Sequence, residues 1–221
     1  MHEFSAFLDQ VWLARFVILK GLGLTVSISF ASIAAGSILG VVLGLTLVYG
    51  NRFARLIARG YTDFVRGTPV LVLVLASYYI LSTVGINLDP FEAGVLALSV
   101  FCSSHVGEIL RGALQSIHKG QTEAAKAIGL TFSQTFAYVL WPQALRQMLP
   151  TWVNTAAEMV KASTLLSVIG VAELLLRTQQ IISRNFMSLE FYFFAGFLYF
   201  VINYGIERFG KYVERKTAIS S

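Results

Sequence analysis

Charged residues are scarce in this sequence. Only 13% of its 221 residues are Asp, Glu, Lys or Arg, whereas a soluble domain usually contains about 25%. Hydrophobic residues make up 56% of the chain, and its mean hydropathy is +0.68. Disorder requires the opposite composition, with low hydrophobicity and high charge, and is excluded. The remaining class is a membrane protein with several spanning segments.

Cysteine and the common catalytic patterns are also missing. Cys102 is the single cysteine, so a disulfide scaffold within the chain is excluded. The sequence contains neither a P-loop pattern nor a His-Glu-x-x-His pattern. Cys102 and His105 lie three residues apart, but two ligands do not make a metal site. We therefore expect no catalytic residues, no metal and no bound cofactor in this chain.

Long uncharged runs predict where the chain crosses the membrane. A bilayer core about 30 Å thick needs about 20 mostly apolar residues in a helix. We predict an all-α integral membrane fold in which residues 1–221 form a single transmembrane domain with five spans. The predicted spans cover about 16–49, 67–88, 91–112, 144–172 and 188–210.

The distribution of basic residues predicts the orientation. Connections one and three and the C-terminal tail hold twelve of the 17 Lys and Arg residues. Basic residues favour the cytoplasmic side of a membrane. We therefore expect the N-terminus outside and the C-terminus in the cytoplasm. This asymmetry accounts for the net charge of +5 without nucleic-acid binding, which no cluster of basic and aromatic residues supports.

The fourth predicted segment carries two charges, Glu158 and Lys161. Charges at this depth face protein or a water-filled cavity, and three-residue spacing places both on one helical face. One interpretation is a buried ion pair that orients the segment. The other is that Glu158, taken as the only deep acid, meets an ammonium group or a basic side chain of a substrate near mid-membrane, with Lys161 near the substrate carboxylate or paired with Glu158 when the site is empty. Asn154 lies one turn earlier, and Ser163 and Thr164 offer hydroxyls where the helix loosens, so all five are candidate substrate-pathway residues.

The connection over about residues 113–143 is too structured to be a simple linker. It contains a predicted short helix with Thr122 as N-cap, Glu123 near the positive end of the helix dipole, and Ala124 and Ala125 as helix formers. Gly129 suits the left-handed position that ends a helix. A helix of about two turns is unstable alone in water. It either joins two spans as a surface helix or docks into a groove on a partner.

Three glycines in the first span predict close helix packing. Gly36, Gly40 and Gly44 repeat every four residues and form a ridge of small residues along one helical face.

The pattern Glu123-Ala124-Ala125 followed by Gly129 resembles the EAA loop of bacterial ABC-transporter permeases. Further matches extend from about residue 25 to the C-terminal tail and resemble the polar amino acid branch of that family, the histidine, glutamine and opine type. The segments that carry them are Arg66-Gly67-Thr68-Pro69, Lys119-Gly120-Gln121, Pro142-Gln143-Ala144-Leu145-Arg146, Asn154 and Lys161-Ala162-Ser163-Thr164-Leu165.

The resemblance implies a function and a set of partners. Two permease subunits, identical or homologous, would form the pathway for polar amino acids or related compounds such as opines. The short helix with Glu123, Ala124, Ala125 and Gly129 would couple each subunit to a cytoplasmic ABC ATPase dimer that binds ATP and magnesium. A solute-binding protein would deliver substrate from outside a bacterial cytoplasmic membrane.

Two other functions remain open at this stage. An ion-coupled secondary transporter would need coupling-ion sites, usually in internal repeats, and the sequence shows no repeat. A membrane scaffold would bind a cytoplasmic partner and transport nothing.

Overall fold

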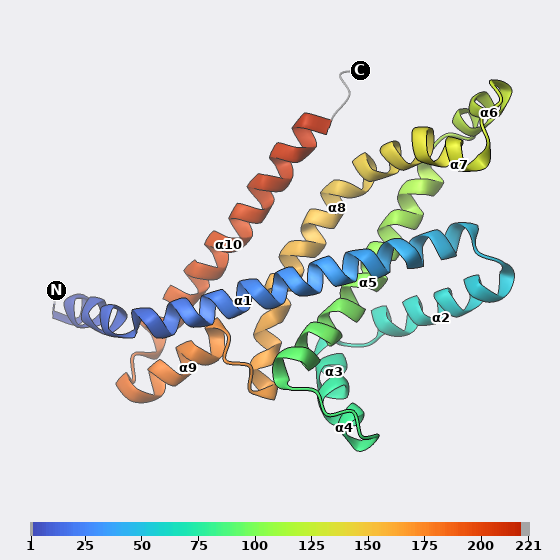
Figure 1. Ribbon diagram of the computed structural model, residues 1–221. Helices are drawn as coiled ribbons and strands as arrows, with labels where there is room; N and C mark the ends of the chain where they lie inside the picture. The colour runs from blue at the N-terminus through green and yellow to red at the C-terminus, as the bar shows by residue number, and fades with distance from the viewer. Residues whose placement is uncertain (1, 218–221) are drawn as a thin grey trace.

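The computed structural model describes residues 2–217 of the chain, and the surroundings of side chains 5–216. This range is helical apart from short connections (Figure 1), which confirms the predicted all-α class. The helices are α1 His2–Tyr49, α2 Arg52–Gly67, α3 Val70–Leu75, α4 Leu81–Thr83, α5 Pro90–Ser116, α6 Lys119–Ala127, α7 Phe132–Thr135, α8 Trp141–Ala162, α9 Leu174–Asn185 and α10 Ser188–Thr217. Turns of π-helix at Ala76–Ile80 and Phe136–Leu140 precede α4 and α8, and a 3₁₀ helix, Ser163–Ile169, follows α8.

Three helices, α1, α5 and α10, are long and apolar enough to cross a membrane. Two bent pairs pass the same test: α2 with the helix Val70–Thr83, at 108°, and Phe132–Ile169 with α9, at 53°. The described residues thus hold three candidate spans, or up to five if each bent pair is one crossing. Helix α1 has 48 residues and a length of about 72 Å, well beyond the thickness of a bilayer core.

Helix α2 occupies the stretch that we expected to be a connection between the first two spans. It is strongly amphipathic and carries four arginines. Its buried residues are Ala58, Thr62 and Val65, and the opposite face exposes the apolar side chains of Phe53, Leu56, Ile57 and Phe64. The side chain of Asn51 caps its first turn by accepting a hydrogen bond from Ala54 N at 2.8 Å. Pro69 disfavours helical geometry at Thr68, which is extended, and the chain bends there before α3 begins.

The contact between α1 and α5 is the most extensive helix pairing in the described chain. A Cβ atom added at Gly36 would lie 2.5 Å from Cβ of Cys102, and one at Gly40 would lie 2.6 Å from Cβ of Val106. At Gly44 the added atom would lie 2.8 Å from the carbonyl oxygen of Gly107. The predicted ridge of small residues is therefore confirmed, and it brings the two backbones together over two helical turns.

A buried carboxylate joins three helices near the middle of α1. Glu173 is fully buried and caps α9 by accepting hydrogen bonds from the backbone N–H groups of Leu175 and Leu176. The hydroxyl of Tyr199 on α10 donates to the same carboxylate at 2.5 Å, and that of Thr25 on α1 donates at 3.5 Å. Every described partner is a hydrogen-bond donor, as a buried carboxylate requires.

The α1–α5 contact predicts a clear effect of side-chain volume. Gly40→Leu would drive the new side chain into Val106, and we expect the free energy of unfolding to fall by about 1–3 kcal/mol. Gly23→Leu is the control, because nothing lies within 4 Å of a Cβ atom at that position. Thermal unfolding of the purified proteins in detergent measures both. Equal melting temperatures for the two variants would contradict the close packing.

Candidate functional site

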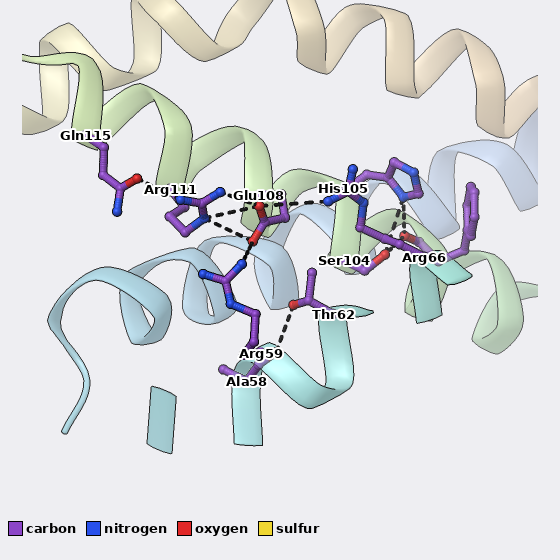
Figure 2. A network of polar contacts seen from close by, with 10 residues as sticks. Ala58, Arg59, Thr62, Arg66, Ser104, His105, Glu108, Arg111 and Gln115 are labelled. Carbon is purple, nitrogen blue, oxygen red and sulfur yellow. Dashed lines mark hydrogen bonds and ion pairs between the residues drawn. The ribbon is translucent and has the colours of Figure 1, made fainter. Parts of the chain in front are cut away.

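A cluster of charges lies where α2 crosses α5. The side chain of Glu108 on α5 is 13% exposed, and three arginines surround it (Figure 2). Arg111 is the closest, with its Nη2 atom 2.6 Å from Oε2 of Glu108. From α2, Arg59 approaches to 3.5 Å and Arg66 to 3.8 Å. One carboxylate therefore neutralises one of three guanidinium groups, and the cluster keeps an excess of positive charge.

Two further hydrogen bonds hold α2 against α5 beside this cluster. The hydroxyl of Tyr61 bonds to the carbonyl oxygen of Val100 at 3.2 Å and to the hydroxyl of Ser103 at 2.7 Å. Within α5, the guanidinium of Arg111 donates a hydrogen bond to the side chain of Gln115 at 2.7 Å. The position of Arg66 is thus set by a helix that is fixed at several points.

An open groove of about 480 Å³ begins at this cluster and runs along α8. Its walls carry positive, negative and neutral polar groups. The lining residues are Arg66, His105, Glu108, Ile109, Thr151, Asn154, Thr155 and Glu158. The guanidinium side chain of Arg66 is 46% exposed and only weakly paired with Glu108. The groove therefore offers a cation from α2 and an anion, Glu158, from α8.

The structure brings together some of the predicted pathway residues but not all of them. Asn154 and Glu158 line the groove, as one helical face requires. Lys161 lies further along the same helix and does not line it. Ser163 is fully buried and its hydroxyl donates to Val160 O, whereas the hydroxyl of Thr164 donates to Lys161 O. Both hydroxyls therefore serve the backbone where α8 tightens into the 3₁₀ helix.

The ion pair that one of the two interpretations placed between Glu158 and Lys161 is not formed. Both residues are exposed, and every ion pair in the described part of the chain involves Glu108 instead. The interpretation of a buried pair within one segment is therefore wrong. Glu158 is also not the only deep acid, because Glu173 is fully buried.

The predicted short helix exists as α6, although it begins earlier than expected. His118 caps it, since its Nδ1 accepts a hydrogen bond from Gly120 N at 3.1 Å. Thr122 therefore lies inside the helix, and Glu123 is mid-helix instead of at the N-terminus. Gly129 has φ +83°, which confirms its predicted left-handed conformation. Its N–H donates to Lys126 O, and that of Leu130 donates to Ala125 O, so the helix ends in a Schellman motif.

Helix α6 exposes most of its surface. Ala125 is buried, whereas Glu123 and Ala124 are exposed. Two large apolar side chains that follow α6 in the sequence are also exposed, Ile128 at 78% and Tyr138 at 75%.

Sequence reasoning missed the groups that pair over long range. Arg59 and Arg66 lie between the predicted spans 16–49 and 67–88, and Glu108 lies within the predicted span 91–112, so no sequence pattern paired them. Recognising α2 as an amphipathic helix would have placed its arginines opposite α5. Residues 5–216 contain no group of three or more His, Cys, Asp or Glu side chains arranged to hold a metal ion.

These features define a helical protein with several apolar helices able to cross a membrane, a charged groove and a separate short exposed helix. The chain belongs to the family of binding-protein-dependent transport system inner membrane components, whose model matches residues 13–219. This confirms the resemblance to ABC-transporter permeases. The protein is a membrane transport subunit, and ATP hydrolysis belongs to a separate subunit.

Relatives match along nearly the whole chain. The glutamine transport system permease protein GlnP of Escherichia coli (strain K12) is 35% identical over 213 residues, covering 96% of this chain and 97% of GlnP. The arginine transport system permease protein ArtQ of Bacillus subtilis (strain 168) is 35% identical over 215 residues, covering 97% and 96%. The solved structure of an amino acid ABC transporter with histidines superposes with a TM-score of 0.88 at 33% identity, covering 95% of this chain and 98% of that one.

The charge cluster predicts that loss of its carboxylate destabilises the protein more than loss of one of its exposed arginines. Glu108→Gln would leave three guanidinium groups without a carboxylate, and we expect the free energy of unfolding to fall by about 3 kcal/mol. Arg59→Gln removes only an exposed partner at 3.5 Å and should cost less than about 1 kcal/mol. Denaturant unfolding in detergent compares the two. A larger loss for Arg59→Gln would show that Glu108 is not the centre of the cluster.

Proposed function

We propose that this permease subunit carries polar amino acids, or related compounds such as opines, through a pathway that it forms with a second permease subunit. A cytoplasmic ABC ATPase dimer, which binds ATP and magnesium, drives the transport. An extracytoplasmic solute-binding protein delivers the substrate. The observation that supports the substrate class most directly is the groove, which is lined by the guanidinium of Arg66, by Glu108 that pairs with it, and by the carboxylate of Glu158, which forms no ion pair with residues 5–216.

The groove suits a zwitterion. Arg66 offers a guanidinium, the group best matched to a carboxylate because its N–H donors form a planar fork. Glu158 offers an acceptor for an ammonium group, and Asn154 lies one turn away on the same face with both donor and acceptor atoms. Two relatives that match along nearly the whole chain carry the names of glutamine and arginine transporters. Both of these amino acids contain a carboxylate, an ammonium and a further polar group.

Helix α6 is the proposed contact with the ATPase. Its exposed face includes Glu123 and Ala124, and the turn at Gly129 fixes the direction in which the chain leaves it. Ala125 is buried, and α6 packs against the π-helical turn that leads into α8. A displacement of α6 would therefore be passed to the helix that carries Asn154 and Glu158. Lys161, Ser163 and Thr164 then belong to the pathway as the segment in which α8 changes its geometry.

The proposed topology has five spans in a bacterial cytoplasmic membrane, with each bent pair counted as one crossing. The N-terminus lies outside and α6 lies in the cytoplasm, as the positive-inside distribution favours.

A cysteine introduced at position 5 tests this orientation. We expect a membrane-impermeant thiol reagent added to intact cells to label Ser5→Cys, because the charge bias places this end outside. Unsubstituted protein is the control, since its single cysteine, Cys102, is buried. Labelling that appears only after the cytoplasmic side is opened would reverse the topology.

Substitutions at Gly129 test the coupling to the ATPase. We expect Gly129→Val to abolish co-purification of the ATPase and ATP-driven uptake into proteoliposomes, because a β-branched residue does not tolerate positive φ. Gly129→Asn is the matched control, since asparagine adopts this conformation and should retain both activities. Full uptake without any ATPase would instead indicate a secondary transporter. ATPase binding by the unsubstituted chain without uptake would indicate a scaffold.

Substitution of Glu158 tests the substrate site. Glu158→Gln keeps the shape of the side chain but removes its charge, so we expect the uptake rate at saturating binding protein to fall on the order of tenfold. Glu190→Gln removes an exposed charge from the first turn of α10 and should leave the rate unchanged. Unaltered transport by Glu158→Gln would remove Glu158 from the pathway.

A further inference from the structure

A second groove, which we call the apolar groove, lies on the side of α8 opposite the polar one. It has a volume of about 600 Å³ and is lined by residues between 26 and 37 of α1, between 152 and 160 of α8, and between 202 and 209 of α10. Val153, Ala156 and Val160 of α8 are buried and form its floor, whereas Phe30 of α1 and Phe209 of α10 are exposed on its walls. Three helices therefore build one open apolar site.

The apolar groove exists because α1 and α10 run apart. Both helices contact α9 and diverge from there, and α8 contacts both of them (Figure 1). Helices α8 and α10 meet closely at Gly210, where an added Cβ atom would lie 2.5 Å from Cγ1 of Val153. Gly205 lies about a turn and a half earlier and also lines the groove, but nothing lies within 4 Å of a Cβ atom there. The groove is thus open beside Gly205.

The apolar groove offers no free polar group to a ligand. Its lining contains three side chains with polar atoms, and each already takes part in a hydrogen bond. The hydroxyl of Ser29 donates to Thr25 O at 2.7 Å, and the indole N–H of Trp152 donates to the hydroxyl of Ser37 at 2.8 Å. An occupant of the groove is therefore held there by apolar contact.

The length and the surroundings of the groove fit one acyl chain of a lipid. Helices α1 and α10 are candidate spans, so the medium beside the groove is hydrocarbon. Between residues 26 and 37 helix α1 rises about 16 Å, close to half of a bilayer core about 30 Å thick. An empty groove would leave its walls without van der Waals partners. An acyl chain from one leaflet therefore has the length and the chemistry to fill it.

Two cations lie beyond one end of the apolar groove. Arg146 precedes Val153 by seven residues, and Lys216 follows Phe209 by seven, so each lies about two helical turns further along the face that lines the groove. Both are exposed, and neither forms an ion pair with residues 5–216. The close contact at Gly210 places these two ends of α8 and α10 together. This end of the groove is therefore positively charged.

We propose that the apolar groove binds one anionic phospholipid, with an acyl chain along α8 and the phosphate beside Arg146 and Lys216. Guanidinium and ammonium groups both bind phosphate, and their long side chains extend along an apolar surface toward the headgroups. Anionic lipids of the cytoplasmic leaflet attract basic residues near the membrane surface. The assignment to this leaflet rests on the proposed orientation, whereas the site itself does not.

Fluorescence quenching tests the site, because Trp152 lines it. The complex is purified with its ATPase in a Trp12→Phe, Trp141→Phe background, and the signal of Trp152 is the part lost on a further Trp152→Phe substitution. Nanodiscs of phosphatidylcholine contain the same minor fraction of either chain-brominated phosphatidylglycerol or chain-brominated phosphatidylcholine. We expect quenching of Trp152 by both, with an association constant at least about fivefold higher for phosphatidylglycerol, because a basic residue near the surface contributes about that factor.

A groove-filling substitution tests where the lipid binds. Gly205→Phe places a large side chain in the groove without a clash, and we expect the quenching of Trp152 to be lost because the acyl chain is excluded. Gly196→Phe is the matched control, since it lies on the same helix, also has nothing within 4 Å of its Cβ atom, and does not line the apolar groove. Quenching that persists with Gly205→Phe would place the lipid elsewhere and overturn the proposal.

A pair of charge substitutions tests the headgroup contact. Arg146→Gln with Lys216→Gln should abolish the preference for phosphatidylglycerol and keep quenching by phosphatidylcholine. Arg208→Gln with Arg215→Gln is the matched control: it removes the same charge from a side of α10 turned away from the groove, and the preference should persist. An equal loss of preference in both double variants would show a general surface potential and would overturn the assigned phosphate site.

The remaining outcomes are also decisive. Equal quenching by the two lipids in the unsubstituted groove would overturn the assignment of an anionic lipid. Quenching by neither lipid, as when a helix of another subunit covers the groove, would overturn the lipid site altogether. None of these measurements uses transport. A complex that shows the predicted quenching but takes up no amino acid would therefore remove the proposed function and leave the lipid site standing.

Discussion

The bilayer core offers no hydrogen bonds, and three acidic side chains, Glu108, Glu158 and Glu173, meet this constraint in different ways. Glu173 is satisfied within the chain by backbone and hydroxyl donors from three helices. Glu108 is satisfied by arginines from α2 and α5. Glu158 has no ion-pair or side-chain hydrogen-bond partner among residues 5–216. The first two carboxylates therefore hold the subunit together, whereas the third provides a reason for the subunit to bind something else.

Much of the fold could be predicted because apolar runs and glycine spacing are local signals. The all-α class, the ridge of small residues on α1 and the left-handed turn at Gly129 all followed from short stretches of sequence. The paired groups could not be predicted in this way. Arg59 and Arg66 meet Glu108 only because the chain turns back on itself at Gly50 and Asn51, and a search for uncharged runs passes over an amphipathic helix with four arginines.

The candidate site shows the same division between local and distant signals. Helical spacing placed Asn154 and Glu158 on one face, and both line the groove. The same spacing suggested a pair between Glu158 and Lys161, but helical proximity permits an ion pair without requiring it. The start of α6 was misplaced because His118, which is not a common capping residue, accepts the first free N–H. Arg66 lines the groove because α2 packs against α5, and the sequence of α2 alone does not predict that contact.

The backbone contact between α1 and α5 limits how the subunit can move. Helices that meet through glycines lie in each other's grooves with no intervening flexible side chains, so sliding one past the other would force Cys102 and Val106 over the backbone of α1. The two helices therefore form one rigid unit. A rearrangement within this subunit would therefore leave the α1–α5 pair intact and use other connections, and the chain bends at Thr68 and between Ile169 and Leu174.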